Sequence, residues 1–192
     1  MSIVIPYGHN MTRFLAIDPG STKTGVAKFT INNNTNSIIN IEAGTLNLDS
    51  DPYDTMISSE MHGDKIVRLI KLEHRMLELL NSIHPDAVVC ESAFYNPRKP
   101  NAYASLTEVI FLLKRVTLNY NLNVRFSTLA PKAVKEVIGS MKTTDKGKDP
   151  IKEAIIKIPE VYNLIYKYIN NLDNHAIDAI AIGYTFFKKQ GE

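Results

Sequence analysis

This chain of 192 residues has a single cysteine, a formal net charge of only +2, and no apolar run long enough to span a membrane. One cysteine excludes an internal disulfide and is typical of a reducing compartment. The small net charge excludes a polycation, so any nucleic-acid surface must come from local clusters of lysine and arginine. The first residues lack the basic start and long apolar core of a signal peptide. We therefore expect a cytoplasmic protein without membrane contact.

The length and composition favour one globular domain. Hydrophobic residues make up 44% of the chain, which is enough for an ordinary core. Met11 stands just before the first apolar run, so we expect a single domain over residues 11–192, preceded by an extension over residues 1–10. Cys90 lies within an apolar run and is expected to be buried rather than reactive.

The hydrophobic pattern predicts alternating strands and helices. Apolar runs bounded by turn residues predict strands over 13–18, 25–31, 38–46, 87–91 and 123–129. Apolar residues at helical spacing predict helices over 62–83, 104–120, 131–138 and 175–188. A further helix is expected from Pro150 onward, with Asp149 as its cap. Loops are expected over 47–60, 94–103 and 139–148, and Pro159 is expected to end or kink a helix. This order indicates an α/β fold with a five-stranded mixed sheet flanked by helices.

Two acidic residues stand where apolar runs end. Asp18 follows one run and precedes a Pro-Gly turn, and Glu91 ends another. A carboxylate at the end of a buried strand is costly to bury unless it meets a cation. His175 and Asp178 share one face of the last predicted helix. Carboxylate oxygens suit Mg²⁺ or Mn²⁺, and no thiolate cluster argues for zinc, so these residues together indicate a divalent-cation site.

Each of these residues also has an ordinary structural explanation. An aspartate before Pro-Gly commonly stabilises the turn, and a glutamate at a strand end is commonly solvated. A histidine and an aspartate three positions apart on a helix commonly form an exposed pair. Asp173 is expected to cap the last helix rather than to act in the site. Their occurrence together, in this order, favours the metal site.

Four segments resemble the Holliday-junction resolvases of the RuvC family, within the ribonuclease H-like superfamily. In family order they are Ile17-Asp18-Pro19-Gly20 with Thr24-Gly25, Glu91-Ser92-Ala93-Phe94, Ala130-Pro131-Lys132-Ala133-Val134-Lys135, and His175-Ala176-Ile177-Asp178-Ala179. The resemblance extends over roughly residues 13–187 and implies a ribonuclease H-like fold. The Asn- and Lys-rich composition would suit a phage or low-GC bacterial member, acting in the bacterial or host cytoplasm.

The resemblance implies an endonuclease that resolves Holliday junctions or other branched DNA by paired symmetric incisions, in recombination and repair. It also implies two Mg²⁺ ions per site, replaceable by Mn²⁺, held by Asp18, Glu91, Asp178 and His175. Metals in such pairs lie ~3.5–4 Å apart and activate hydroxide. His175 aligns with a family position that is aspartate in some members, so it could instead act as a general acid or base.

The resemblance further implies DNA contacts and a homodimer. Lys135 matches a functional lysine of the family, and Lys148, or alternatively Lys146, matches a second. Phe94 matches a residue that wedges against bases, although it could equally pack onto the core. The implied DNA-binding set is Phe94, Arg98, Lys99, Lys132, Lys135, Lys146 and Lys148. A two-fold dimer matches a four-way junction, with helix 104–120 as the implied interface, whose apolar face could equally be core.

Three other functions stay open from the sequence. A ribonuclease H-like nuclease that cuts flaps, RNA–DNA hybrids or structured RNA would carry the same metal site. Residues 18–25 also resemble the phosphate loop of actin-like ATPases and sugar kinases, but this chain is too short for their two lobes and has no second Asp-x-Gly motif. A nuclease fold that only binds DNA would require a disrupted acid set, whereas Asp18, Glu91 and Asp178 are all present.

Overall fold

The computed structural model describes residues 10–50, 58–95, 97–98, 100–140 and 149–190. The extension expected over residues 1–10 therefore lies, apart from Asn10, outside the described residues, as do Lys99, Lys146 and Lys148. None of the helices in these ranges is both long and apolar enough to cross a bilayer.

Five strands form one mixed sheet in the order β3-β2-β1-β4-β5. They are β1 (Met11–Asp18), β2 (Lys23–Asn32), β3 (Ser37–Asn47), β4 (Ala87–Glu91) and β5 (Arg125–Leu129). The first three strands form an antiparallel meander, whereas β4 runs parallel to β1 and β5 parallel to β4. The predicted five-stranded mixed sheet flanked by helices is confirmed.

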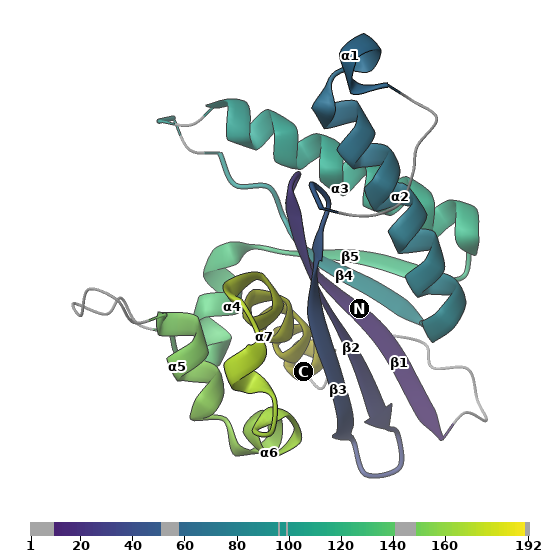
Figure 1. Ribbon diagram of the computed structural model, residues 1–192. Coiled ribbons are helices and arrows are strands. Elements are labelled where there is room, and N and C mark those ends of the chain that lie inside the picture. Colours follow the sequence, from purple (N-terminus) through teal and green to yellow (C-terminus); the bar gives the residue numbers. More distant parts are fainter. Residues whose placement is uncertain (1–9, 51–57, 96, 99, 141–148, 191–192) are drawn as a thin grey trace.

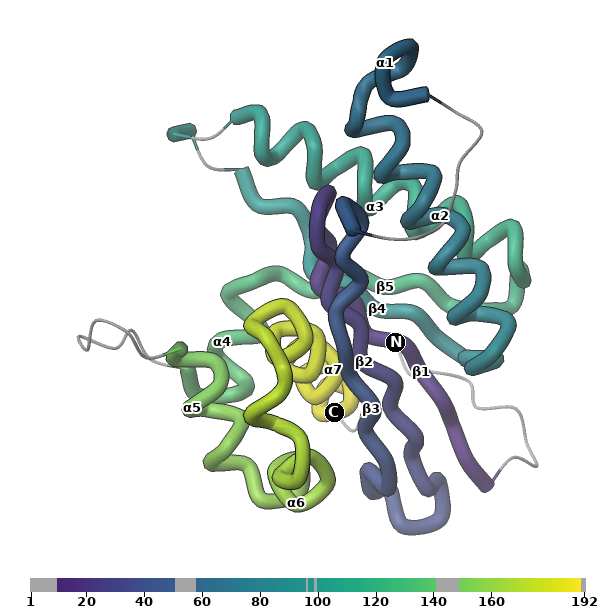
Figure 2. The backbone as a smooth tube through the Cα atoms, viewed as in Figure 1, coloured from purple at the N-terminus to yellow at the C-terminus, as the bar shows by residue number. Residues whose placement is uncertain are grey.

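Helices cover both faces of this sheet (Figure 1). They are α1 (Ser59–His62), α2 (Asp64–Ile83), α3 (Pro100–Tyr120), α4 (Pro131–Ile138), α5 (Pro150–Ile156), α6 (Pro159–Ile165), the 3₁₀ turn η1 (Ile169–Asn171) and α7 (Asn174–Gln190). In the tube view, α2 and α3 lie on one face, and α7 lies on the other together with the shorter helices α4, α5 and α6 (Figure 2).

Strand β1 supplies side chains to two separate cores. Leu15 and Ile17 are buried with Leu72 of α2 and Leu113 of α3. Phe14 and Ala16 belong to the opposite cluster, which α7 completes. Because side chains alternate along a strand, Asp18 falls on the α7 face. Cys90, on the α2–α3 face of β4, is buried as expected, and burial raises the pKa of its thiol to about 12.

The structure corrects the sequence prediction in two of the predicted loops and bears it out at Pro159. α3 begins at Pro100, within the loop predicted over 94–103, because proline fits the first turn of a helix, where its missing N–H is not needed. The prediction that Pro159 ends or kinks a helix agrees with the structure, because α5 ends at Ile156 and Pro159 opens the separate helix α6. α1 occupies the end of the loop predicted over 47–60, where the Ser58 side chain caps it by accepting a hydrogen bond from the Glu60 N–H.

Candidate active site

Two strand-end carboxylates meet at one end of the sheet. In the parallel pairing of β1 and β4, Ile17 lies beside Cys90, so the following residues, Asp18 and Glu91, are also neighbours. Glu91 alternates with Cys90 and therefore lies on the α7 face, as Asp18 does. The sequence patterns identified both residues, and the sheet register brings them together.

The first turn of α7 adds His175 to this end of the sheet. Asp173 precedes the helix and caps it, accepting a hydrogen bond from the Ala176 N–H at 3.1 Å, so the predicted capping role is confirmed. His175 Nδ1 lies 2.8 Å from Asp18 Oδ2. The Asp18 side chain is only 16% exposed, whereas that of His175 is 41% exposed. The histidine therefore lies over an almost buried carboxylate.

Gly25 makes this approach possible. It pairs with Asp18 across β1 and β2. A Cβ atom at Gly25 would lie 1.9 Å from the His175 carbonyl oxygen, a distance at which the backbone has to move. The glycine of the Thr24-Gly25 motif therefore lets the backbone of α7 rest directly on the sheet beside Asp18.

Replacing Gly25 by alanine is expected to push the first turn of α7 away from Asp18. We expect the free energy of unfolding to fall by about 1–3 kcal/mol, because the clash involves backbone on both sides, and any activity of the site to fall with it. Chemical denaturation measures the first effect. Gly44→Ala is the matched control, since a Cβ atom at Gly44 would meet nothing within 4 Å. Equal stability of the two variants would contradict this account of the close approach.

Three carboxyl groups act on one another electrostatically. Burial raises the pKa of Glu91 to about 7, and the charge of Asp18 adds to the increase. Burial also raises the pKa of Asp178 to about 7, with further increases from Asp18, Asp149 and Glu91. The pKa of Asp18 is raised by burial too, although the hydrogen bond from His175 works against it. Lys135 and His175 offset only part of the buried negative charge: Lys135 acts on Glu91, and His175 acts on Asp18.

The donor chemistry of these residues suits a hard divalent cation. Asp178 Oδ1 is buried without a hydrogen-bond partner among the described residues, so it has a lone pair available for a ligand. Within the same described part of the chain, no three histidine, cysteine or acidic side chains converge closely enough to form a ready-made metal cage.

Asp149 is a residue near the site that the sequence pattern assigned only to helix capping. Its Oδ1 atom caps α5 as predicted, accepting hydrogen bonds from the Ile151 and Lys152 N–H groups at 2.9 and 3.4 Å. Its other oxygen, Oδ2, is buried and has no partner among the described residues. The effect of Asp149 on the pKa of Asp178 shows that α5 brings a further negative charge close to the carboxylates.

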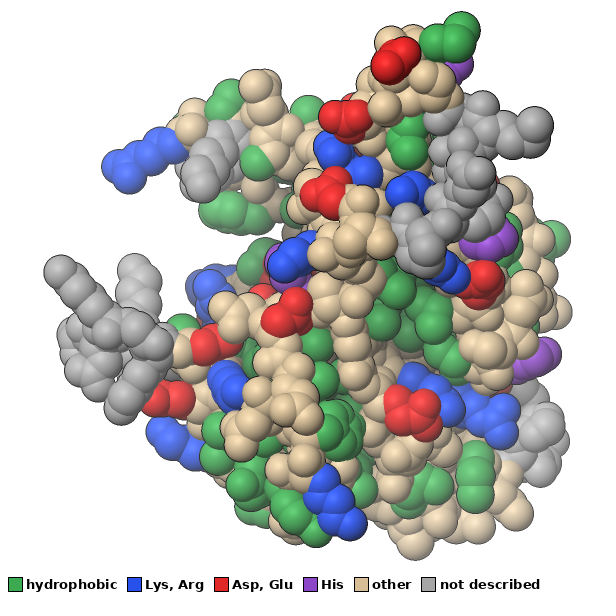
Figure 3. Space-filling view, viewed as in Figure 1, with side chains coloured by type: hydrophobic (Ala, Val, Ile, Leu, Met, Phe, Trp, Pro, Cys, Tyr) green, Lys and Arg blue, Asp and Glu red, His purple; other side chains and the backbone are tan. Residues whose placement is uncertain are grey.

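Lys135 borders the acids from α4. It lines a small cavity of about 150 Å³ together with Glu91 and Asp178, and its charge lowers the pKa of Glu91. In the space-filling view, acidic, basic and histidine side chains gather at the inner end of a hollow between the start of α3 and the lobe of α4 and α5 (Figure 3). Lys135, to which the resemblance assigns a functional role, therefore lies beside the acids.

The other described residues of the predicted DNA-binding set lie on the surface. Phe94 is 68% exposed, so the alternative that it packs onto the core is wrong. Arg98 is also exposed. The Lys132 side chain is 88% exposed and lies 3.6 Å from Glu136. These residues are accessible to a ligand that approaches the hollow.

The sheet order and the helices on both faces define a ribonuclease H-like fold, and solved structures that share it are Holliday-junction resolvases. The yeast mitochondrial resolvase Ydc2 aligns with a TM-score of 0.64 and 16% identity, over 94% of this chain and 79% of its own. Thermus thermophilus RuvC, in complex with a Holliday junction substrate, aligns with a TM-score of 0.60 and 18% identity, over 94% of this chain and 96% of its own. The fowlpox virus Holliday junction resolvase aligns with a TM-score of 0.57 and 15% identity, over 93% of this chain and 99% of its own.

Because the sequence identities to these solved structures are low, the structural similarity establishes the fold alone. No family profile matches the sequence, and a search of curated proteins gave no match. The predicted similarity to RuvC-type resolvases is confirmed for the fold, over nearly the whole chain.

Proposed function

We propose that the protein is a metal-dependent endonuclease that resolves Holliday junctions, or closely related branched DNA, during recombination and repair. The observation that carries the proposal is that Asp18, Glu91 and Asp178 lie near one another and beside Lys135, in a fold shared with junction resolvases. A binding module without catalysis would not need to hold three carboxyl groups so close that burial and mutual repulsion perturb their pKa values.

The acids would hold two Mg²⁺ ions, or Mn²⁺ ions in their place. Asp18 acts on both Glu91 and Asp178, which makes it the residue best placed to be shared by the two ions. Bound ions supply an activated hydroxide and stabilise the leaving oxygen of the phosphodiester. His175, whose Nδ1 lies 2.8 Å from Asp18 Oδ2, would either help to hold an ion or accept a proton from the attacking water. Lys135 then neutralises charge that develops on the scissile phosphate.

Two coordinated cuts require two copies of the chain, and we propose a homodimer. α3 buries Val109 and Leu113 against the sheet but leaves Phe111 69% exposed. Phe111 lines a groove between α2 and α3 together with Ile66 and Leu69. A groove with such exposed apolar side chains supports an isologous interface on a two-fold axis.

Replacing Phe111 by glutamate is expected to shift the protein from dimer to monomer, because it introduces a charge at the centre of the proposed interface. Light scattering after size-exclusion chromatography measures the mass directly. Leu122→Glu is the control, since Leu122 is 82% exposed in the connection after α3, outside this groove. A wild-type chain that is monomeric at micromolar concentrations would contradict the homodimer.

The test of the proposed function is cleavage of a defined set of nucleic acids. A mobile four-way junction, a linear duplex, a flap and an RNA–DNA hybrid are incubated with the protein in Mg²⁺, in Mn²⁺ and in chelator. Paired, symmetric, metal-dependent nicks in the junction, with ligatable ends, are expected. Preferential cutting of the flap or hybrid would retain the metal mechanism but reject the junction as substrate, and no cutting would favour a binding module.

A further inference from the structure

Asp149 uses one carboxylate oxygen as a helix cap and leaves the other without a partner. Oδ1 accepts hydrogen bonds from the Ile151 and Lys152 N–H groups, at 2.9 and 3.4 Å, which fixes the orientation of the carboxylate. Oδ2 is buried and has no hydrogen-bond partner among the described residues. A carboxylate oxygen is costly to bury unless something binds it, so Oδ2 is available to a ligand.

The first turn of α5 lies against the small cavity that the acids line. Ile151, two residues after Asp149, borders this cavity of about 150 Å³ together with Glu91 and Asp178. α5 packs against α7, and Ile155 of α5 is buried in the core that α7 completes. The charge of Asp149 raises the pKa of Asp178, so the two carboxyl groups act on each other through space. Asp149 therefore adds a further carboxyl group to this end of the sheet.

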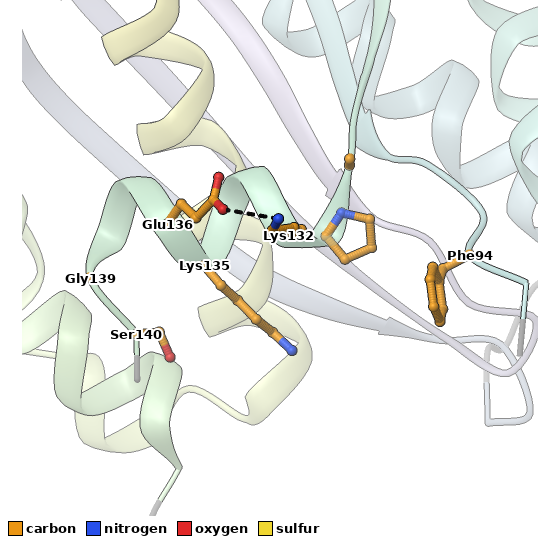
Figure 4. A pocket seen from close by; sticks show the side chains of 8 residues that line it. Phe94, Lys132, Lys135, Glu136, Gly139 and Ser140 are labelled. Carbon is orange, nitrogen blue, oxygen red and sulfur yellow. Dashed lines mark ion pairs between the residues drawn. The ribbon is translucent and has the colours of Figure 1, made fainter. Parts of the chain in front are cut away.

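Positive charge offsets these acids unevenly. Lys135 extends from α4 into a wider cavity of about 770 Å³, which lies between α4 and Phe94 (Figure 4). Its charge lowers the pKa of Glu91. Of the described residues whose charges act on Asp178, only His175 lowers the pKa, against increases from three carboxylates. The side of the pocket between α5 and α7 therefore carries negative charge that is less compensated, and this suits a cation.

A hydrated divalent cation matches both the unpartnered oxygen and the excess of negative charge. Mg²⁺ dehydrates reluctantly and usually keeps several waters, whose hydrogens need acceptors. The described residues bring no three histidine, cysteine or acidic side chains together into a metal cage, and water can bridge the distances that remain. Hydrogen-bond partners around the direct ligands commonly raise metal affinity by about 10–100-fold.

We propose that Asp149 belongs to the cation site, where Oδ1 holds the first turn of α5 and Oδ2 accepts a hydrogen bond from water on the ion that Asp178 binds. The inference rests on the proposed function and adds to it a residue outside the set that the resemblance implies. One carboxylate then serves both the fold of α5 and the affinity for the ion, and a substitution can separate these two roles.

Asp149→Asn is the substitution that separates them. Asparagine caps a helix as well as aspartate does, through its carbonyl oxygen. With that oxygen on the Ile151 and Lys152 N–H groups, its NH₂ group replaces Oδ2 and presents a donor where water on the ion needs an acceptor. We expect this variant to bind Mn²⁺ about ten-fold more weakly than the wild type. Without metal, it should melt at the wild-type temperature or above, because a buried negative charge is gone.

The measurement is Mn²⁺ binding to the protein without DNA, followed by paramagnetic resonance, in which the free ion gives a sharp signal and the bound ion a broad one. Mg²⁺ is then titrated against the bound Mn²⁺. Asp86→Asn is the matched control and should bind as the wild type does. Asp86 also accepts a backbone hydrogen bond, from the Arg13 N–H at 2.8 Å, but it precedes β4, whereas Glu91 ends this strand. Asp149→Ser keeps a capping oxygen without a second polar atom, and should lose affinity as Asp149→Asn does.

The outcomes distinguish this inference from the proposed function. Wild-type Mn²⁺ affinity in folded Asp149→Asn and Asp149→Ser variants would overturn the inference, leave the endonuclease intact and limit Asp149 to its helix cap. If the wild type binds no Mn²⁺, or if a Glu91→Gln, Asp178→Asn double variant binds it equally tightly, the proposed metal site falls together with the inference. Thermal melting shows that each variant is folded.

Discussion

Replacing Asp18 by asparagine is expected to lower the rate of junction cleavage by about a thousand-fold or more, with junction affinity changed only a few-fold. Asparagine has the shape of aspartate and retains an oxygen that accepts a hydrogen bond from His175, so the packing of α7 on the sheet is preserved. The change removes the negative charge that the two proposed metal ions share. The proposed phosphate contacts of the exposed lysines and arginine would be unaffected, so we expect binding to persist.

The same substitution is expected to make the metal-free protein at least as stable as the wild type. The charge of Asp18 raises the pKa values of both Glu91 and Asp178, so removing it relieves a repulsion between buried groups. Asp49→Asn is the matched control, because Asp49 is an exposed acid paired with Arg68 of α2, and this variant should cut junctions at the wild-type rate. An Asp18→Asn variant that unfolds, or that loses all junction binding, would contradict a purely catalytic role.

Much of the sheet could be predicted from the sequence because its signals are local. The strand over 87–91 and the helix over 131–138 have the predicted bounds, since turn residues or prolines mark where they begin. Asp18 and Glu91 were found because each ends an apolar run. Asp173 was expected to cap α7, and it does so, because capping depends only on residues a few positions away.

The rest of the site depends on contacts between distant segments. The register that places Asp18 beside Glu91 joins strands whose pairing no local pattern specifies. Asp149 had an adequate local explanation as a cap, so nothing in the sequence indicated that its second oxygen points away from the helix, buried near Asp178. The cavity between Phe94 and α4 likewise exists only once the loop after β4 lies opposite Ser140.

In the absence of metal, the protein is expected to become less stable as the pH rises from about 5 to about 8. The pKa values of Glu91 and Asp178, usually 4.5 and 3.8, are raised to about 7 in the folded protein, mainly by burial. The folded state then binds more protons than the unfolded state between these limits. The stabilisation that comes from protonated Glu91 and Asp178 is therefore complete below their pKa values in the unfolded chain. It is lost as the pH rises through about 7. After allowance for solvent screening we expect a loss of about 2 kcal/mol, or roughly 4–8 °C in melting temperature.

Mg²⁺ is expected to reverse this loss at pH 8, because it binds the ionised carboxylates of the folded protein and not the dispersed acids of the unfolded chain. Thermal melting at pH 5 and pH 8, with Mg²⁺ and with chelator, measures both effects. The acids with lowered pKa values, such as Glu42 and Glu160, titrate below pH 5 and do not contribute in this window. A Glu91→Gln, Asp178→Asn double variant should therefore lose most of the pH slope and all of the response to Mg²⁺. If it retains the wild-type response to Mg²⁺, the ion binds elsewhere, and these carboxylates are not the metal site.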